Sequence, residues 1–284
     1  MNKLRTQRKP KWMKSPLPSG KTYINVKDIV AKNRLHTICT SGNCPNMGEC
    51  WNAGTATFMI LGEICTRACG FCNTKTGKPL AVDYDEPNRI ADSVKKMKLK
   101  HCVLTSVDRD DLPDGGAEIW VMTIKAIKEL TPEVTIEGLI PDFNGNKALI
   151  EQVIEAGAEV VSHNMETVRR LTPTTRTKAK YDTSLEVIKI ISESKARSKS
   201  GIMLGIGETK EEVLETMRDL RSVGCEVITI GQYLQPTPKH LPIIEFVTPE
   251  TFKEYERFGL ELGFRYVESG PLVRSSYHAE KHLL

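Results

Sequence analysis

Residues 57–72 carry the most information in this chain and read Thr-Phe-Met-Ile-Leu-Gly-Glu-Ile-Cys-Thr-Arg-Ala-Cys-Gly-Phe-Cys. An apolar run predicted to be a strand leads into Cys65, Cys69 and Cys72, with C-x3-C-x2-C spacing and an aromatic residue before the last cysteine. Disulfides pair cysteines, whereas iron–sulfur clusters are commonly held by short runs of this kind. Three thiolates would leave one iron of a four-iron cluster open to a small molecule. The alternative is a structural zinc site, although zinc prefers four closed ligands, usually in two separated pairs.

Another triplet lies upstream; in chain order it is the first triplet, and the one at 65–72 is the second. Cys39, Cys44 and Cys50 have C-x4-C-x5-C spacing, so that six of the eight cysteines fall within 34 residues. A second cluster on three thiolates would need a fourth ligand from elsewhere in the chain. His36 is one candidate, and the segment Arg-Ser-Ser-Tyr-His-Ala at 274–279 is another.

The two triplets followed by Arg-Ser-Ser-Tyr resemble the pattern of the lipoyl synthase family, a branch of the radical S-adenosylmethionine superfamily. The resemblance runs from about residue 9 to residue 279, and the combination is highly specific. Four further stretches match the family: 56–62, 105–112, 231–236 and 269–274.

The resemblance implies a 4Fe-4S cluster on Cys65, Cys69 and Cys72. Its open iron would chelate S-adenosylmethionine, and one electron would cleave that molecule to a 5′-deoxyadenosyl radical. Such chemistry belongs to the cofactor, while the protein orients the reactants and excludes competing reactions.

The resemblance also implies an auxiliary 4Fe-4S cluster on Cys39, Cys44, Cys50 and Ser276, the second serine of the Arg-Ser-Ser-Tyr motif. Iron–sulfur clusters favour soft thiolates, so the iron bound by the harder serine oxygen would be held less firmly than the other three. That suits a cluster consumed as the sulfur source. Without the resemblance, Ser276 reads as an exposed serine of the tail.

The activity implied is the insertion of sulfur at C6 and C8 of an octanoyl group that is amide-linked to a lysine of a carrier protein. Two S-adenosylmethionine molecules would be consumed. The implied partners are lipoyl carrier domains (E2 subunits of 2-oxoacid dehydrogenases and the glycine cleavage H protein), an electron donor such as ferredoxin or flavodoxin, and an iron–sulfur carrier that rebuilds the auxiliary cluster.

Loops after the predicted strands supply candidate S-adenosylmethionine contacts. Glycines permit close backbone approach to a ligand, although many strand–helix turns are glycine-rich. An asparagine and a glutamate could bind the ribose or amino group, or simply cap a helix. An arginine after the same strand as these two could hold a carboxylate or carbonyl with paired donors, or form a surface ion pair. The candidates are Gly115, Gly116, Asn164, Glu166, Arg176 and Gly205.

Strand-like and helix-like segments alternate six times after residue 56. This alternation predicts a parallel sheet and an open, partial (βα)6 TIM-type barrel, with its active site at the carboxyl ends of the strands. Asp182 is expected to cap a helix over 183–194, and Thr209 to Glu212 forms a capping box. We expect an extension over 1–55 with the auxiliary cysteines, the barrel over 56–269, and a tail over 270–284 that returns to the barrel mouth.

The composition is 39% hydrophobic and 27% charged, which is ordinary for a globular protein. No apolar stretch is long enough to span a membrane, and no signal peptide is evident, so clustered reduced cysteines point to the cytoplasm. The arm over 1–21, which includes Lys3 and Arg5, has seven basic residues and no acidic residue, so the remainder of the +4 chain carries −3. No base-reading face for nucleic acid is seen. The arm is either solvated or docks an acidic partner.

Two other classes remain open from the residues. One is a different radical S-adenosylmethionine enzyme, such as a biotin-synthase-like or methylthiolating enzyme. The other is a non-enzymatic metal module, either zinc-stabilised or electron-transferring. Cys102 and Cys225 lie in or beside predicted strands and are expected to be inert core residues.

Overall fold

The computed structural model describes residues 8–15, 18–42, 44–53 and 55–283, so Lys3 and Arg5 of the basic arm lie outside the described residues. The strands are β1 His36–Thr37, β2 Thr57–Ile60, β3 Ile64–Cys65, β4 Lys75–Thr76, β5 His101–Ser106, β6 Thr135–Leu139, β7 Val160–Ser162, β8 Arg197–Leu204, β9 Val227–Gln232 and β10 Tyr266–Gly270. The helices are α1 Lys21–Lys32, α2 Ile38–Ser41, α3 Met47–Asn52, α4 Glu86–Met97, α5 Ala117–Leu130, α6 Lys147–Ile154, α7 Thr172–Thr175, α8 Tyr181–Ser192, α9 Lys210–Ser222 and α10 Pro249–Glu261.

One mostly parallel sheet organises the molecule. Its strand order is β1-β2-β5-β6-β7-β8-β9-β10, and every neighbouring pair is parallel except β1 with β2. Strands β3 and β4 form a separate small sheet. Because the strands run the same way along the sheet, the loops at their carboxyl ends gather at one edge, where α/β folds place their sites.

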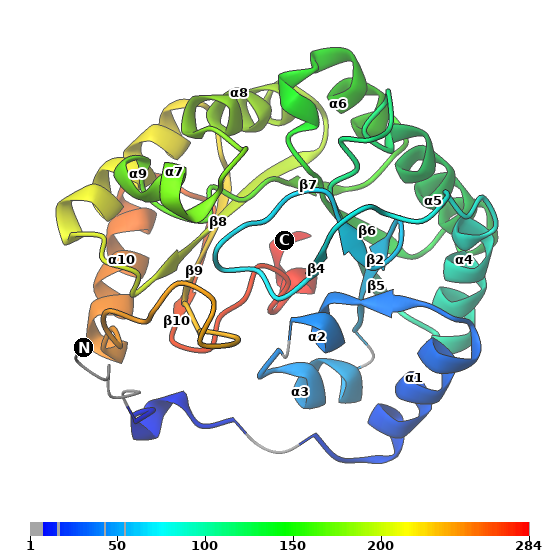
Figure 1. Ribbon diagram of the computed structural model, residues 1–284, viewed down its shortest axis with the longest axis horizontal. Coiled ribbons are helices and arrows are strands. Elements are labelled where there is room, and N and C mark those ends of the chain that lie inside the picture. The colour runs from blue at the N-terminus through cyan, green and yellow to red at the C-terminus, as the bar shows by residue number, and fades with distance from the viewer. Residues whose placement is uncertain (1–7, 16–17, 43, 54, 284) are drawn as a thin grey trace.

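Helices α4, α5, α6, α8, α9 and α10 each follow a strand and surround the sheet, as Figure 1 shows. The apolar spacing predicts helices over 86–97 and 117–130, which α4 and α5 confirm residue for residue, and the capping box of Thr209 and Glu212 at α9 is present. The 3-10 helix Ala279–Leu283, drawn in red, lies near the centre of the ring of strands and helices in Figure 1.

The sequence prediction is wrong for one cap and incomplete for two strands. Helix α8 begins at Tyr181, so Asp182 is not its cap but lies in the first turn and pairs with Arg169 at 2.6 Å. The run 201–204 predicts a strand, but strand β8 begins at Arg197. Its polar start is accommodated by a buried partner, since Lys199 Nζ lies 2.7 Å from Glu137 Oε1 of β6. Strand β10 was not predicted, and it adds a seventh parallel strand.

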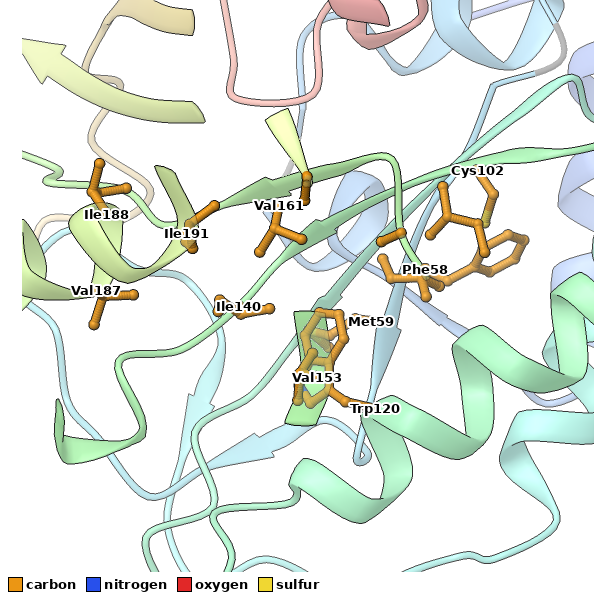
Figure 2. Packing of buried hydrophobic residues seen from close by; sticks show 14 of the residues in the cluster. Phe58, Met59, Cys102, Trp120, Ile140, Val153, Val161, Val187, Ile188 and Ile191 are labelled. Atoms are coloured by element: carbon orange, nitrogen blue, oxygen red, sulfur yellow. The ribbon is translucent and has the colours of Figure 1, made fainter. Parts of the chain in front are cut away.

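The core lies between the sheet and the surrounding helices. Figure 2 shows Phe58 of β2, Cys102 of β5 and Trp120 of α5 packed in it. All four residues of β2 are buried, as expected for a strand covered on both faces. Gly138 of β6 makes room for the indole, since a Cβ there would lie 3.3 Å from Trp120 Cζ3.

Across residues 8–15, 18–42, 44–53 and 55–283, we find no helix whose length and apolar character would let it cross a membrane.

Candidate active site

The loop between β3 and β4 carries the second cysteine triplet and is fixed by its own backbone. It leaves the carboxyl end of β2, and the Gly77 N–H donates to the Cys65 carbonyl at 3.0 Å. Two backbone N–H groups point at the Cys65 sulfur, from Arg67 at 3.4 Å and from Asp108 at 3.3 Å. Donors aimed at a sulfur favour its thiolate form. The loop is therefore shaped around this sulfur by groups from two neighbouring loops.

Arg67, between the first two cysteines of this triplet, ties the loop to the rest of the molecule. Its side chain is 4% exposed and donates to both oxygens of Asp110 at 2.8 and 2.9 Å. It also donates to both oxygens of Asp142 at 2.9 and 2.8 Å. Paired bonds of this kind fix direction as well as distance. Arg67 therefore joins the cysteine loop to the loops that follow β5 and β6.

The three aspartates around Arg67 differ in the direction in which their pKa values shift. Hydrogen bonds from Arg67 hold the pKa of Asp110 well below its usual range. Burial alone would raise the pKa of Asp142, but its bonds with Arg67 outweigh burial and lower it. For Asp108, burial outweighs the attraction of Arg67 and raises the pKa. The Asp108 carboxylate lies 3.8 Å from Cys65 Sγ, so a negative group borders the loop.

Two thiols of this loop, those of Cys65 and Cys69, are hard to ionise in the absence of a cation. Burial raises the pKa of Cys65 to about 11, with a further contribution from Asp108. Burial and the charge of Cys72 raise the pKa of Cys69 to about 12. A bound metal reverses this preference for the neutral thiol, because the thiols that it binds are deprotonated. Buried thiols that lie close together resist ionisation when no metal is present. Such a set of sulfurs suits a cluster whose iron ions are positively charged.

One cavity of about 360 Å³ brings the second triplet together with loops from across the sheet. The predicted site residues in its wall are Cys65, Cys69, Cys72, Asn164, Glu166 and Arg176. Residues 273–275 of the tail line the same cavity.

Asn164 presents an unsatisfied acceptor beside the Glu166 carboxylate in the wall of this cavity. The Asn164 amide nitrogen donates to Glu166 Oε1 at 3.1 Å, while Asn164 Oδ1 is buried with no partner among the described residues. Glu166 has a left-handed backbone with φ of 65°, held by hydrogen bonds of 2.9 Å with Gly201 and Met203. Burial raises the pKa of Glu166. An orphaned amide oxygen beside a carboxylate suits a ligand that brings N–H or ammonium donors, as the amino group of S-adenosylmethionine does.

Arg176 is buried, so the alternative of a surface ion pair is wrong. Its guanidinium donates to Ser184 Oγ at 2.8 Å and reaches the Met165 carbonyl at 3.4 Å. His163 Nε2 lies 3.4 Å away, and His163 Nδ1 lies 2.9 Å from the Ile140 carbonyl. His163 is thus held in the wall by structural bonds. Arg176 brings a buried positive charge to a cavity that also contains a carboxylate.

The three candidate glycines do not line the cavity that holds the cysteines. Gly115 lies in the wall of an adjoining cavity of about 410 Å³. Gly116 packs against Leu61, where a Cβ would lie 2.4 Å from the side chain, and a Cβ on Gly205 would lie 2.3 Å from the Glu245 carbonyl. All three have positive φ, which glycine tolerates best. Their contact with the cofactor remains a prediction.

The first triplet is carried by two short helices outside the parallel sheet. Cys39 lies in α2, Cys50 lies in α3, and the Cys44 N–H donates to the Cys39 carbonyl at 3.0 Å. Burial raises the pKa of Cys50 to about 12, with further contributions from the charges of the other two thiols. The three sulfurs are therefore close enough to oppose each other's ionisation.

Distant segments meet this triplet at Thr57, the first residue of β2. Its hydroxyl donates to Ser276 Oγ at 3.0 Å. Burial raises the pKa of Cys39, while contacts with the Thr57 backbone and hydroxyl oppose the increase. Asn46, between Cys44 and Cys50, donates to the Leu272 carbonyl at 2.7 Å. Thr57 therefore touches both Cys39 and Ser276, which are more than 200 residues apart.

Trp51 supplies an orphaned donor beside the first triplet. It is 2% exposed, and its indole N–H is buried without a hydrogen-bond partner among the described residues. The ring stacks on Tyr23 with centroids 5.3 Å apart. The indole faces the Cys39 sulfur closely enough to oppose the rise in the pKa of that thiol, but no hydrogen bond of regular geometry joins them. A buried unpaired N–H is costly. A cluster with acceptor sulfurs would satisfy it, so the donor set fits an iron–sulfur group.

Within the part of the chain that the structure describes, no three His, Cys, Asp or Glu side chains converge on a point that could hold one metal ion. Cluster ligation does not require that convergence, since each cysteine binds a different iron.

The remaining cysteines are buried in the core, as predicted. Cys102 and Cys225 are both fully buried, and burial raises the pKa of both thiols. Four residues of the site were not predicted from the sequence: Arg67, Thr57, Asp142 and Trp51. Arg67 was visible as a charged residue inside a cysteine loop near an acidic segment, whereas the contacts of Thr57 and Trp51 need the fold.

Comparisons with known proteins agree with this geometry. Residues 59–220 match the Radical SAM superfamily. A crystal structure of methylornithine synthase aligns with a TM-score of 0.56 at 13% identity, covering 87% of this chain and 76% of the other, which shows the fold alone. The fold and the cysteine loop define a member of the radical S-adenosylmethionine superfamily, whose cofactors are a 4Fe-4S cluster and S-adenosylmethionine.

The sequence relatives give the family. A lipoyl synthase of Flavobacterium johnsoniae is 62% identical over 277 residues, covering 97% of this chain and 96% of the relative. A protein of Nematostella vectensis named "Lipoyl synthase, mitochondrial" is 59% identical over 276 residues, covering 97% and 95%. The chain belongs to the lipoyl synthase family. The expectations of a different radical enzyme and of a non-enzymatic metal module are thereby overturned.

Proposed function

We propose that this chain inserts sulfur at C6 and C8 of an octanoyl group amide-linked to a lysine of a lipoyl carrier protein, as a lipoyl synthase. The observation that carries the proposal is that one cavity is lined by the three thiols of the second triplet and by tail residues 273–275, while Thr57 contacts both Cys39 and Ser276. A site for radical formation and a site for a sulfur donor would then adjoin one space.

The cluster loop would hold the resident cofactor through Cys65, Cys69 and Cys72. When bound, the 4Fe-4S cluster supplies the electron that cleaves S-adenosylmethionine reductively. Arg67 fixes the conformation of the loop through its bonds to Asp110 and Asp142. The positive charge of Arg176 suits a carboxylate of the bound molecule.

Asn164 and Glu166 would orient S-adenosylmethionine through its amino group or ribose. The orphaned oxygen of Asn164 and the constrained backbone of Glu166 support this role. Gly115, Gly116 and Gly205 would act one step further away, by letting the loops around the cavity pack closely.

The octanoyl chain would lie along the apolar part of the cavity wall. Side chains from several strands and loops supply it, including Ile38, Met59, Phe71, Leu139, Ile202 and Met203. An apolar wall binds an alkyl chain by removing its surface from water. It also shields a reactive radical from solvent. The wall therefore suits a substrate with no polar group near the carbons that react.

The auxiliary 4Fe-4S cluster would be the sulfur substrate, held by Cys39, Cys44, Cys50 and Ser276. The orphaned N–H of Trp51 supports a group with acceptor sulfurs at this place. A serine ligand makes one iron easier to lose. The oxygen ligand and the short helices around the three cysteines both suit a cluster that is taken apart during turnover.

The finer architecture is part of the proposal. We place residues 1–55 as an extension that carries the auxiliary cysteines, residues 56–269 as a partial (βα)6 barrel, and residues 270–284 as a tail that folds back to the barrel mouth. The six strand–helix units and the contacts of Leu272 and Ser276 support it.

Carrier proteins, a reductant and a cluster-rebuilding protein are the proposed partners, and the cytoplasm is the proposed location. In the described part of the basic arm, Arg8, Lys9, Lys11 and Lys14 are all exposed. A positive patch speeds encounter with an acidic carrier. Partners of this kind are larger than the cavity, so only the octanoyl-lysine would enter it.

The iron and sulfide content of anaerobically reconstituted protein tests the proposal, together with 5′-deoxyadenosine and thiolated product formed from an octanoyl-lysine peptide. We expect about eight irons per chain, in two four-iron clusters. A matched variant with Cys65, Cys69 and Cys72 all changed to alanine should retain about half of the iron and form no 5′-deoxyadenosine. About four irons in the unmodified chain, with cleavage but no sulfur transfer, would discard the auxiliary cluster.

A further inference from the structure

The chain beyond Ser276 runs to the opposite end of the sheet from the cluster loop. A 3-10 helix spans Ala279–Leu283, and we call it the C-terminal anchor. Ala279 is 0% and His282 is 1% exposed. Arg197, the first residue of β8, donates to the His282 carbonyl, and the ring of Tyr266, the first residue of β10, meets the His282 ring at 4.9 Å. The anchor therefore sits at the amino ends of the strands.

The chain before Ser276 is held at the other end of the sheet. The Val273 carbonyl lies so close to Gly231, near the end of β9, that a Cβ there would be 2.1 Å from it. The Leu272 carbonyl accepts from Asn46, between two cysteines of the first triplet. The segment therefore passes through the ring of strands seen in Figure 1, with Ser276 between two attachment points.

The residues next to Ser276 add lateral contacts. The Tyr277 hydroxyl reaches the Glu49 carboxylate at 3.2 Å, and His278 Nδ1 lies 3.4 Å from Glu268 Oε1. Glu49 precedes Cys50 in α3, so the tail is also tied to the helix that carries the third thiol.

Docking of the anchor is poorly explained by stability alone. Both ring nitrogens of His282 are buried without a partner among the described residues, as is Nε2 of His101, the first residue of β5. The Lys199–Glu137 pair is fully buried in the same region of the sheet. Unpaired buried polar atoms cost free energy. A segment selected only for packing would place an apolar side chain here.

We propose that the C-terminal anchor is a positioning element that holds Ser276 at the auxiliary site, with His282 as its principal positioning residue. This inference rests on the proposed function, in which Ser276 is a cluster ligand. Fixing the chain on both sides of the serine limits the positions that its oxygen can reach. Groups that orient a metal ligand without touching the metal contribute to its affinity in this way.

The test uses the chain in which Cys65, Cys69 and Cys72 are alanine, so that only the auxiliary cluster is present. Four forms are compared: this parent, its Ser276→Ala variant, a truncation after His278, and the two changes combined. The measurements are the rate of iron loss to a chelator and the Mössbauer signal of the iron that lacks a cysteine ligand. Unfolding temperature is measured alongside, and Glu280→Gln, which changes an exposed anchor residue, is the matched control.

We expect the truncation to accelerate iron loss about tenfold, to change the same iron signal as Ser276→Ala, and to add nothing when combined with it, because both act through one ligand. Glu280→Gln should behave as the parent. If the two effects multiply, the anchor only supports the fold and the inference is wrong. If Ser276→Ala is accelerated but the truncation is not, the inference also fails.

If Ser276→Ala itself changes neither measurement, the ligand role in the proposed function is what fails. Should the truncation not fold, His282→Ala replaces it, and the same comparison with Ser276→Ala decides the inference.

Discussion

The two cysteine triplets are built in opposite ways. The triplet at 65–72 lies in one loop that closes on itself through β3 and β4 and is locked by Arg67. The triplet at 39–50 lies on two short helices and meets its other contacts at Thr57, Leu272 and Ser276, far away in sequence. A permanent cofactor suits the self-contained loop. A sulfur donor that is used up and replaced suits a site assembled from separate pieces.

The largest expected effect separates the two triplets outright. Cys65→Ala should abolish cleavage of S-adenosylmethionine and therefore sulfur insertion as well. Cys39→Ala should still cleave it but insert no sulfur. Mass spectrometry of 5′-deoxyadenosine and of the peptide product measures both, and Cys102→Ala is the control because that thiol is buried in the core. Loss of cleavage in both variants would contradict the division of labour.

Removing the lock of the self-contained loop should have the next largest effect. Arg67→Met leaves the buried Asp142 without its ion-pair partner and leaves the half-buried Asp110 paired with Lys178 alone. Removing one partner of a buried pair typically costs about 3–5 kcal/mol. We expect the free energy of unfolding to fall by that order and iron bound at residues 65–72 to decrease, with the auxiliary iron unchanged. Denaturant titration and iron analysis report the two effects. Arg89→Met removes a more exposed ion pair with Asp83 and should cost far less.

The assembled site should respond to the hardness of its fourth ligand. Ser276→Cys would replace the weak oxygen ligand with a thiolate that iron prefers. We expect slower iron loss to a chelator and less sulfur inserted per S-adenosylmethionine cleaved. The ratio of lipoyl product to 5′-deoxyadenosine measures this, and Ser275→Cys is the matched control. Undiminished sulfur insertion would show that weak binding of the iron at Ser276 is not needed for sulfur transfer.

A smaller effect is expected from the orphaned indole. Trp51→Phe keeps the ring that stacks on Tyr23 but removes the N–H. Hydrogen bonds to cluster sulfurs help to set reduction potentials, and losing a donor makes reduction harder. The auxiliary cluster should shift to a more negative potential while the other cluster does not. Trp120→Phe removes an indole N–H that bonds Ser106 of β5 rather than a residue of the first triplet, and it should leave the auxiliary potential unchanged.

The smallest effect concerns pH and the amino ends of the strands. Burial, followed by the nearby charge of Lys199, lowers the pKa of His101 to about 4, so the unfolded chain takes up the proton first as pH falls below 6.5. Stability present above pH 6.5 is therefore lost between pH 6.5 and 4, by at most about 1.4 kcal/mol per pH unit for this histidine. His101→Asn keeps an atom near Thr135 and should flatten that dependence in urea titrations. An unchanged slope would place the proton uptake elsewhere.

The self-contained loop was readable from sequence, and so were the helices with clear caps. Local spacing was enough because the ligands, the strand before them and the fold-back are contiguous. The site around the triplet at 39–50 could be predicted only from the family resemblance. The residue types of Thr57 and Trp51 give no sign of contacts with distant parts of the chain. The start of β8 was not predicted because its polar Lys199 is buried against Glu137. Strand β10 was not predicted because it lies at the edge of the sheet and carries polar residues.

The contact between Thr57 and Ser276 spans 219 residues. A contact of that range closes a very long loop, whose entropic cost is repaid only once the intervening strands are in place. The tail contacts several strands of the sheet, so it can take its place only after those strands have assembled. Segment 271–283 should therefore be among the last parts to order during refolding, and the contacts around the 65–72 loop should form well before those that complete the other triplet.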